Sequence, residues 1–139
     1  MEIRSFHPTD ISCVKSLISA IMNKEYPVEE KAYQYGDLNS ISDAYGALRE
    51  KFLVVQEDDE VIGTIGIKED SDSTALLRRL FVHSSHRGRQ IGSMLVDTAL
   101  DFCKMNGNPN VWKKSNKNGN RKTGMLPRYR KRRNAKKRT

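Results

Sequence analysis

The residues that could do chemistry are concentrated in one short run, residues 83–93, with the sequence HSSHRGRQIGS. Gly88 and Gly92 allow the backbone to turn tightly and allow a ligand to approach the main chain closely. A helical pattern begins at the end of the run, so free N–H groups and the positive end of a helix dipole would face the same place. Arg87 and Arg89 add positive charge. The run predicts an anion-binding loop, although many strand-to-helix turns with Gly and Arg bind nothing, and a purely structural turn is an equal alternative.

Two patterned segments flank this run and would hold it in place. Residues 74–82 are mostly apolar and predict a strand that leads into the run. Residues 91–105 repeat apolar side chains at spacings of three and four, which predicts a mostly buried helix. Asn106 and Gly107 would end that helix, because both residue types tolerate the left-handed conformation. The run is therefore expected to connect a strand to a helix.

The first half of the chain predicts further elements of a mixed fold. Residues 51–56 and 61–67 are rich in β-forming residues and are separated by an acidic turn, which predicts an antiparallel hairpin. A short strand at residues 2–6 precedes an amphipathic helix over about residues 10–21. A second helix is expected at residues 40–49.

Residues 77–95 closely resemble the acetyl-CoA-binding core of the GCN5-related N-acetyltransferase (GNAT) superfamily. The signature of that family is Gln/Arg-x-x-Gly-x-Gly/Ala, and here Arg87 fills its first position and Gly92 its last. Gln90 departs from it, because it stands where the middle glycine is expected. The order of the predicted elements over residues 1–107 also matches the family.

The resemblance implies an α/β (α+β) fold in which helices flank a mixed, mostly antiparallel sheet, with acetyl-CoA as the co-substrate and no metal. In the family, the strand backbone bonds the pantetheine arm and the loop amides hold the pyrophosphate. Carried over by position, the implied cofactor-binding residues are Leu80, Phe81, Val82, Arg87, Gly88, Arg89, Gln90, Ile91, Gly92 and Ser93.

The reaction implied by the resemblance is transfer of an acetyl group to an amine of a small molecule or a protein. The sequence assigns no catalytic residue to it. Family members often carry a Glu on this strand, and here Leu76 stands in its place. His83, Glu57 and Glu69 are weighed as the base, and the sequence favours none of them. His83 and His86 lie three residues apart, but without a third ligand they predict no metal site.

Four tyrosines occur in the segment that lines the acceptor pocket in related enzymes. Two interpretations stay open for them, a role in acceptor specificity and ordinary packing. They are Tyr26, Tyr33, Tyr35 and Tyr45.

Charge divides the chain into two parts. The net charge of +8 would by itself suggest nucleic acid as a partner, but residues 1–107 hold 17 acidic and 12 basic residues, whereas residues 108–139 hold 13 basic residues and no acidic one. We therefore expect an acetyl-CoA-binding core at 1–107 and a basic, disordered tail at 108–139. Val111 and Trp112 could begin one more strand, but the pattern of the family stops there, and the fold is expected to be incomplete at its C-terminal end.

Three interpretations of the basic tail compete. It is a nucleic-acid-binding arm, a solvated appendage, or the product of a shifted reading frame, and we favour the last because the tail combines Lys, Arg and Asn with no acid. The first of these underlies an alternative function, that of a non-enzymatic nucleic-acid-binding protein. An incomplete core would also have reduced activity and an exposed sheet edge that favours a homodimer.

The remaining composition excludes other classes. No apolar run reaches the roughly 20 residues that span a bilayer, and the N-terminus lacks the pattern of a signal peptide, so a cytoplasmic protein is expected. Cys13 and Cys103 lie far apart in sequence and show no paired spacing. We expect both to be buried, reduced thiols.

Overall fold

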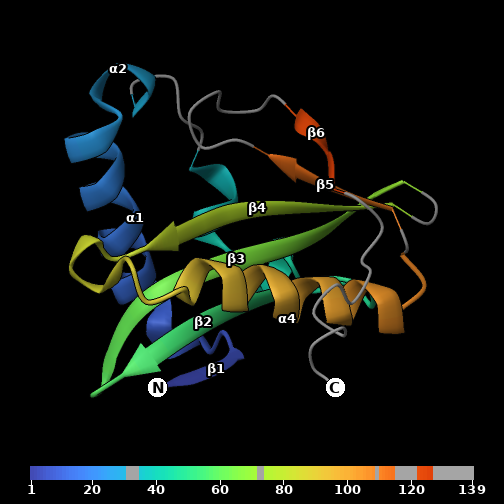
Figure 1. Ribbon diagram of the computed structural model, residues 1–139, viewed down its shortest axis with the longest axis horizontal. Coiled ribbons are helices and arrows are strands. Elements are labelled where there is room, and N and C mark those ends of the chain that lie inside the picture. Colours follow the sequence, from blue (N-terminus) through green and yellow to red (C-terminus); the bar gives the residue numbers. More distant parts are fainter. Residues whose placement is uncertain (31–34, 72–73, 109, 115–121, 127–139) are drawn as a thin grey trace.

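The computed structural model describes residues 1–30, 35–71, 74–108, 110–114 and 122–126. One sheet of six strands forms its centre, in the spatial order β1-β2-β3-β4-β5-β6, and helices cover both faces (Figure 1). Neighbouring strands are antiparallel except for the parallel pair of β4 and β5. The strands are β1 Glu2–Ser5, β2 Lys51–Glu57, β3 Glu60–Ser71, β4 Thr74–Val82, β5 Asn110–Lys114 and β6 Lys122–Leu126.

Two long helices, α1 and α4, pack on opposite faces of this sheet. Helix α1 spans Ile11–Glu25 and α4 spans Ile91–Met105, and both confirm helices expected from apolar periodicity. The shorter elements connect them to the strands. They are the helices α2 Pro27–Glu30 and α3 Ile41–Ala44 and the 3₁₀ turns η1 Pro8–Asp10, η2 Gly36–Asn39 and η3 Ser84–His86.

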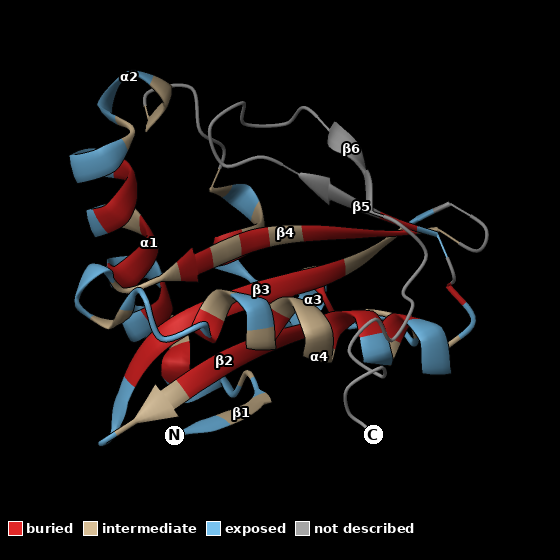
Figure 2. Cartoon of the chain, viewed as in Figure 1, coloured by how far each residue is buried: buried red, intermediate tan, exposed pale blue. Residues whose placement is uncertain are grey.

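The sheet divides the core into two layers (Figure 2). Alternate residues of β2 show the division, because Phe52 and Val54 belong to the layer under α1, whereas Leu53 and Val55 belong to the layer under α4. Residues of α3 and η2, such as Ile41 and Leu38, close the α1 layer. We call these two sides of the sheet the α1 face and the α4 face.

The predicted hairpin, the strand leading into the loop and the α/β fold class are confirmed. Strands β2 and β3 pair in antiparallel register around a turn in which Asp58 and Asp59 have positive φ. The second helix expected at residues 40–49 is wrong beyond Ala44. It ends there because Tyr45 leaves the helical conformation, with φ of −120°, and packs its ring edge-on against Phe52.

Regular structure continues past residue 107, into the segment expected to be a disordered tail. Val111 and Trp112, which the sequence left as a possible strand start, lie in β5, which runs beside β4, and Val111 is buried in the α4-face core. Strand β6, which the sequence pattern did not predict, then pairs with β5. The predicted nucleic-acid arm lies mainly at 127–139, outside the described residues, so its disorder stays a prediction.

The two cysteines differ in exposure, which corrects the expectation that both are buried. Cys103 on α4 is buried, and burial raises the pKa of its thiol to about 12. Cys13 on α1 is exposed. Only the thiolate reacts rapidly with electrophiles, so burial protects Cys103 twice, by access and by ionisation.

We predict that a maleimide reagent modifies Cys13 alone in the native protein at pH 7.5. Mass spectrometry of the intact chain should then show one adduct, assigned to Cys13 by peptide mapping, and two adducts after unfolding in denaturant. Modification of Cys103 in the native protein at a rate close to that of Cys13 would contradict this arrangement of α4 on the sheet.

Candidate acetyl-CoA and acyl-transfer site

A cleft of about 480 Å³ lies where β4 ends and α4 begins. All of the residues predicted to bind the cofactor line it except Arg89. Two residues of α1 and its C-terminal cap, Ile21 and Tyr26, complete the wall, and the sequence pattern did not indicate them. The cleft-lining residues predicted from the sequence are Leu80, Phe81, Val82, Arg87, Gly88, Gln90, Ile91, Gly92 and Ser93.

The loop between β4 and α4 owes its shape to two residues with positive φ. Gly88 has φ of 84°, and Gln90, the N-cap of α4, has φ of 62° and ψ of 24°. Gln90 thus adopts the left-handed conformation that the glycine of the family signature adopts easily. For a residue with a side chain this conformation costs about 1–2 kcal/mol. The turn therefore accommodates Gln90, at a position where a glycine would adopt the same conformation at lower cost.

Gly92 is not required by the packing of the protein itself. A Cβ atom built there would meet only the Cγ2 atom of Val82, at 3.8 Å, which is ordinary van der Waals contact. The first turn of a helix offers unpaired N–H groups, and a residue without a side chain leaves them open to a ligand. Gly92 therefore fits a place where another molecule approaches the backbone.

The two arginines of the loop are held by carboxylates from elsewhere in the fold. Arg87 donates from Nε to the carbonyl oxygen of Val82 at 3.0 Å, and its Nη1 lies 2.7 Å from Oε1 of Glu25. Arg89 pairs with Glu57 at 3.1 Å and is not part of the cleft lining. Both pairs are partly exposed, so each contributes little to stability. They place one positive charge, that of Arg87, at the rim of the cleft.

A β-bulge in β4 lies next to the cleft. On the facing strand, Thr64 pairs with Phe81 and Gly66 pairs with Arg78, so two residues of β4 oppose one residue of β3. The extra residue is Arg79, whose φ is 58°. Its carbonyl oxygen accepts a hydrogen bond from Oγ1 of Thr64 at 2.8 Å.

The side chain of Arg79 is buried, 4% exposed, and is neutralised by Asp37 of η2. Its Nε donates to Oδ2 of Asp37 at 3.0 Å, and its Nη2 donates to Oδ1. The hydroxyl of Tyr45 donates to Oδ2 of Asp37 at 2.5 Å. Burial acts to raise the pKa of Asp37, but the hydrogen bonds from Arg79 and Tyr45 and the charges of Arg79 and Arg78 together outweigh it and hold that pKa below its ordinary value. The three side chains tie η2 and the end of α3 to the bulge.

The parallel pairing of β4 with β5 stops just before this bulge. Among the described residues its register covers Thr74–Leu77 of β4 and Asn110–Lys113 of β5. The bulge at Arg79 and the cleft at Leu80 and beyond follow directly. The cleft therefore opens along the part of β4 that lies beyond the register with β5.

The residues weighed as bases are not in the cleft lining. His83 lines a neighbouring groove, and its ring nitrogen accepts a hydrogen bond from the backbone N–H of Ser85 at 3.1 Å. Glu57 pairs with Arg89, Glu69 lies 3.3 Å from Arg49, and Leu76 is buried. Within the described residues, no group of three potential metal ligands occurs.

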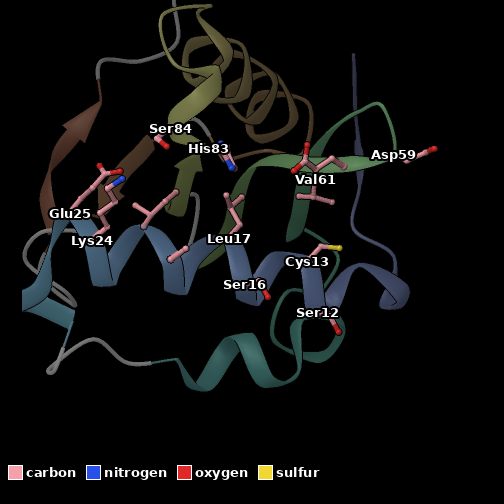
Figure 3. A pocket seen from close by; sticks show the side chains of 13 residues that line it. Ser12, Cys13, Ser16, Leu17, Lys24, Glu25, Asp59, Val61, His83 and Ser84 are labelled. Carbon is pink, nitrogen blue, oxygen red and sulfur yellow. The ribbon is translucent and has the colours of Figure 1, made fainter.

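The neighbouring groove has a volume of about 570 Å³ and lies between α1 and the strand ends of β3 and β4. Figure 3 shows His83 and Ser84 facing the row of α1 side chains that includes Leu17 and Lys24. It shares Ile21 with the cleft but contains none of the loop residues 87–93. Helix α1 thus contributes to the lining of both hollows.

Of the four tyrosines singled out in the sequence, the structure places one in the cleft lining and one beside the bulge. Tyr26 lines the cleft, and Tyr45 holds Asp37. Tyr35 donates to Glu30 at 3.3 Å, and Tyr33 lies outside the described residues. The Arg79–Asp37 pair was missed, although two adjacent arginines inside an apolar strand are a signal that a buried partner is needed.

Comparisons with known proteins agree on one family. The sequence profile of the Acetyltransferase (GNAT) family matches residues 15–123. A probable N-acetyltransferase, camello, from Xenopus tropicalis is 36% identical over 58 residues, which are 40% of this chain and 26% of that protein. The aligned part thus spans about a quarter of that relative.

Solved structures show the same fold. An acetyltransferase of the GNAT family from Staphylococcus aureus Mu50 superposes with a TM-score of 0.75 at 19% identity, covering 82% of this chain and 72% of that one. A GNAT family acetyltransferase from Brucella melitensis, solved in complex with acetyl-CoA, has a TM-score of 0.63 at 23% identity, covering 83% and 75%. The chain belongs to the GNAT acetyltransferase family.

We predict that Asp37→Asn destabilises the protein by about 3–5 kcal/mol at pH 7, because it leaves the buried charge of Arg79 without its counter-charge. The pKa of Asp37 is lowered by folding, so its stabilisation is present above its ordinary value of 3.8 and is lost as the pH falls through the lower folded value. Urea unfolding at pH 7 and pH 3 should show a smaller difference between variant and wild type at pH 3. Asp43→Asn, on the exposed side of α3, is the matched control and should have little effect at either pH.

Proposed function

We propose that this protein binds acetyl-CoA in the cleft between β4 and α4 and transfers the acetyl group to an amine, as an N-acetyltransferase. The observation that carries the proposal is the loop at residues 87–93, with its two left-handed residues and an open glycine at the start of a helix, in a member of the GNAT family. The similarity to a GNAT acetyltransferase solved with acetyl-CoA supports the choice of co-substrate.

The loop residues bind the phosphate end of the co-substrate. The first-turn amides of α4 and the positive end of its dipole face the cleft and attract the pyrophosphate, and Arg87 adds a charge at the rim. The apolar side chains of Leu80 and Ile91 line the cleft and exclude water from a bound arm. The backbone of β4 at residues 80–82 borders the same space.

Acetyl-CoA supplies the acetyl group as a thioester, whose C–S bond breaks as the C–N bond to the amine forms. The amine loses a proton and the departing sulfur gains one. Of the described residues that line the cleft, none is an acid or a histidine, so the cleft itself offers no strong base to the amine. Tyr26 and Ser93 carry the hydroxyl groups that can donate a hydrogen bond there.

The other associations expected from the sequence stay predictions. They are a cytoplasmic location, nucleic-acid binding through residues 108–139, and a homodimer. Among the described helices, none combines the length and the apolar character needed to cross a membrane.

We predict that Gly92→Ala weakens acetyl-CoA binding by about tenfold or more, because its methyl group occupies the space where a ligand meets the helix amides. The same change should leave the melting temperature equal or higher, since Ala favours a helix over Gly by about 1 kcal/mol and the protein leaves room for it. Titration calorimetry with acetyl-CoA measures the first effect and thermal unfolding the second.

Gly36→Ala is the matched control for that experiment, because a Cβ there meets nothing within 4 Å and Gly36 is not among the cleft-lining residues. It should bind acetyl-CoA like the wild type. If the wild type shows no acetyl-CoA binding, or if Gly92→Ala binds it equally well, the proposed function in this cleft is wrong.

We predict that Glu25→Gln tightens acetyl-CoA binding about two- to fivefold at low salt. The carboxylate of Glu25 lies 2.7 Å from Arg87 and so competes with a phosphate for that cation. Glu57→Gln is the paired control, because its partner Arg89 is not part of the cleft lining and its effect should be smaller. Weaker binding by Glu25→Gln would show instead that Glu25 positions Arg87, and calorimetry at two salt concentrations separates these outcomes.

A further inference from the structure

The bulge places two consecutive arginines of β4 on the same face of the sheet. Arg78 stands opposite Gly66, where an added Cβ would point at Tyr45 and Phe52, so this register position belongs to the α1 face. Arg79 reaches Asp37, which also lies on the α1 face. In a regular strand, neighbouring side chains alternate between faces, and the extra residue of the bulge removes that alternation here.

The two arginines differ in how their charge is balanced. Arg79 is neutralised by Asp37, and Lys68, another cation of this face, lies 3.4 Å from Glu50. Arg78 acts on the charge of Asp37 only from beyond ion-pair distance and has no ion pair within the part of the chain that the structure describes. Its Nε is buried without a hydrogen-bond acceptor there. A buried N–H of a cation is costly unless an acceptor is supplied.

Arg78 also lies next to the place where acetyl transfer is proposed. It directly follows Leu77, the last residue of β4 in register with β5, and it precedes Leu80, where the cleft lining begins. Arg78 is half-buried, so part of its side chain is open to an acceptor that approaches the middle of β4 from the α1 face. A guanidinium binds a carboxylate through two parallel hydrogen bonds, which orients the partner as well as attracting it.

We propose that Arg78 binds a carboxylate of the acceptor, so that the preferred substrates are amines that carry an acidic group. This inference rests on the proposed acetyltransferase function and adds the chemical class of its acceptor. Arg78 is then a specificity-determining residue, and Arg79 with Asp37 keeps the bulge that presents it.

The test is an acceptor panel in which each acid is compared with its own amide. Glycine, β-alanine and 4-aminobutyrate are assayed for acetylation beside glycinamide, β-alaninamide and 4-aminobutyramide. The amides keep an amine at the same distance but lack the negative charge, and the series varies the separation between amine and acid. We expect at least one acid to exceed its amide by about tenfold in kcat/KM after correction for the unprotonated fraction of each amine, mainly through a lower KM.

Arg78→Met should abolish that preference, with the rates for the amides and the affinity for acetyl-CoA unchanged. Arg78→Lys should keep part of it, because a positive charge remains without the planar fork. Lys104→Gln, which removes one positive charge from the exposed end of α4, is the control and should keep the full preference.

Several outcomes would overturn the inference. If the wild type binds acetyl-CoA but its kcat/KM for each of the three acids is no higher than for the matching amide, the inference is wrong. It is also wrong if the wild type binds acetyl-CoA but acetylates none of the six compounds. A preference that survives intact in a folded Arg78→Met would assign the acid to another residue and remove the role of Arg78. Absence of acetyl-CoA binding by the wild type would instead contradict the proposed function on which the inference rests.

Discussion

The buried ion pair between Arg79 and Asp37 is the interaction on which the site depends. A residue with positive φ in the middle of a strand is costly unless the surrounding structure holds it, and here Asp37, Tyr45 and Thr64 all bond to Arg79 or to its partner. The pair joins η2, a connection far away in sequence, to the strand beside the cleft. It thereby links the α1 face of the sheet to the place where β4 leaves its register with β5.

The lining of the cleft combines the end of β4, the loop after it and the start of α4. Its predicted phosphate-binding part consists of amides at the start of α4, and Arg87 is held at its rim by Glu25. A site of this kind tolerates changes of side chain as long as the backbone keeps its path. Gln90 illustrates this, because it occupies the position of a glycine and adopts a left-handed conformation at the cost of some strain.

Local patterns were sufficient for the elements around the loop, and they failed where an element depends on a distant partner. Strand β4 and helix α4 have the predicted bounds, because apolar periodicity and the Asn-Gly end of the helix are local signals. Strand β5 is short, and it is stabilised by pairing with β4 and by burial of Val111. Strand β6 pairs with β5 in turn. Because this pairing depends on another strand, the local sequence pattern did not predict β6. The helix expected to reach residue 49 ends at Ala44, because packing of Tyr45 on the sheet outweighs local propensity.

By itself, the sequence determined the strand–loop–helix unit, the glycines and arginines of the loop, and the resemblance to the GNAT family, because all of these are encoded within a few consecutive residues. The tertiary structure decided which residues of α1 line the cleft, that Arg79 is paired with Asp37, and that Arg78 has no ion pair among the described residues. Those facts depend on contacts between residues far apart in the chain, such as Asp37 and Arg79, and on a bulge that no periodicity records. A site made of consecutive backbone amides can be predicted from the sequence. The pairing of charges on one face of the sheet cannot, because it depends on contacts that form only when the chain folds.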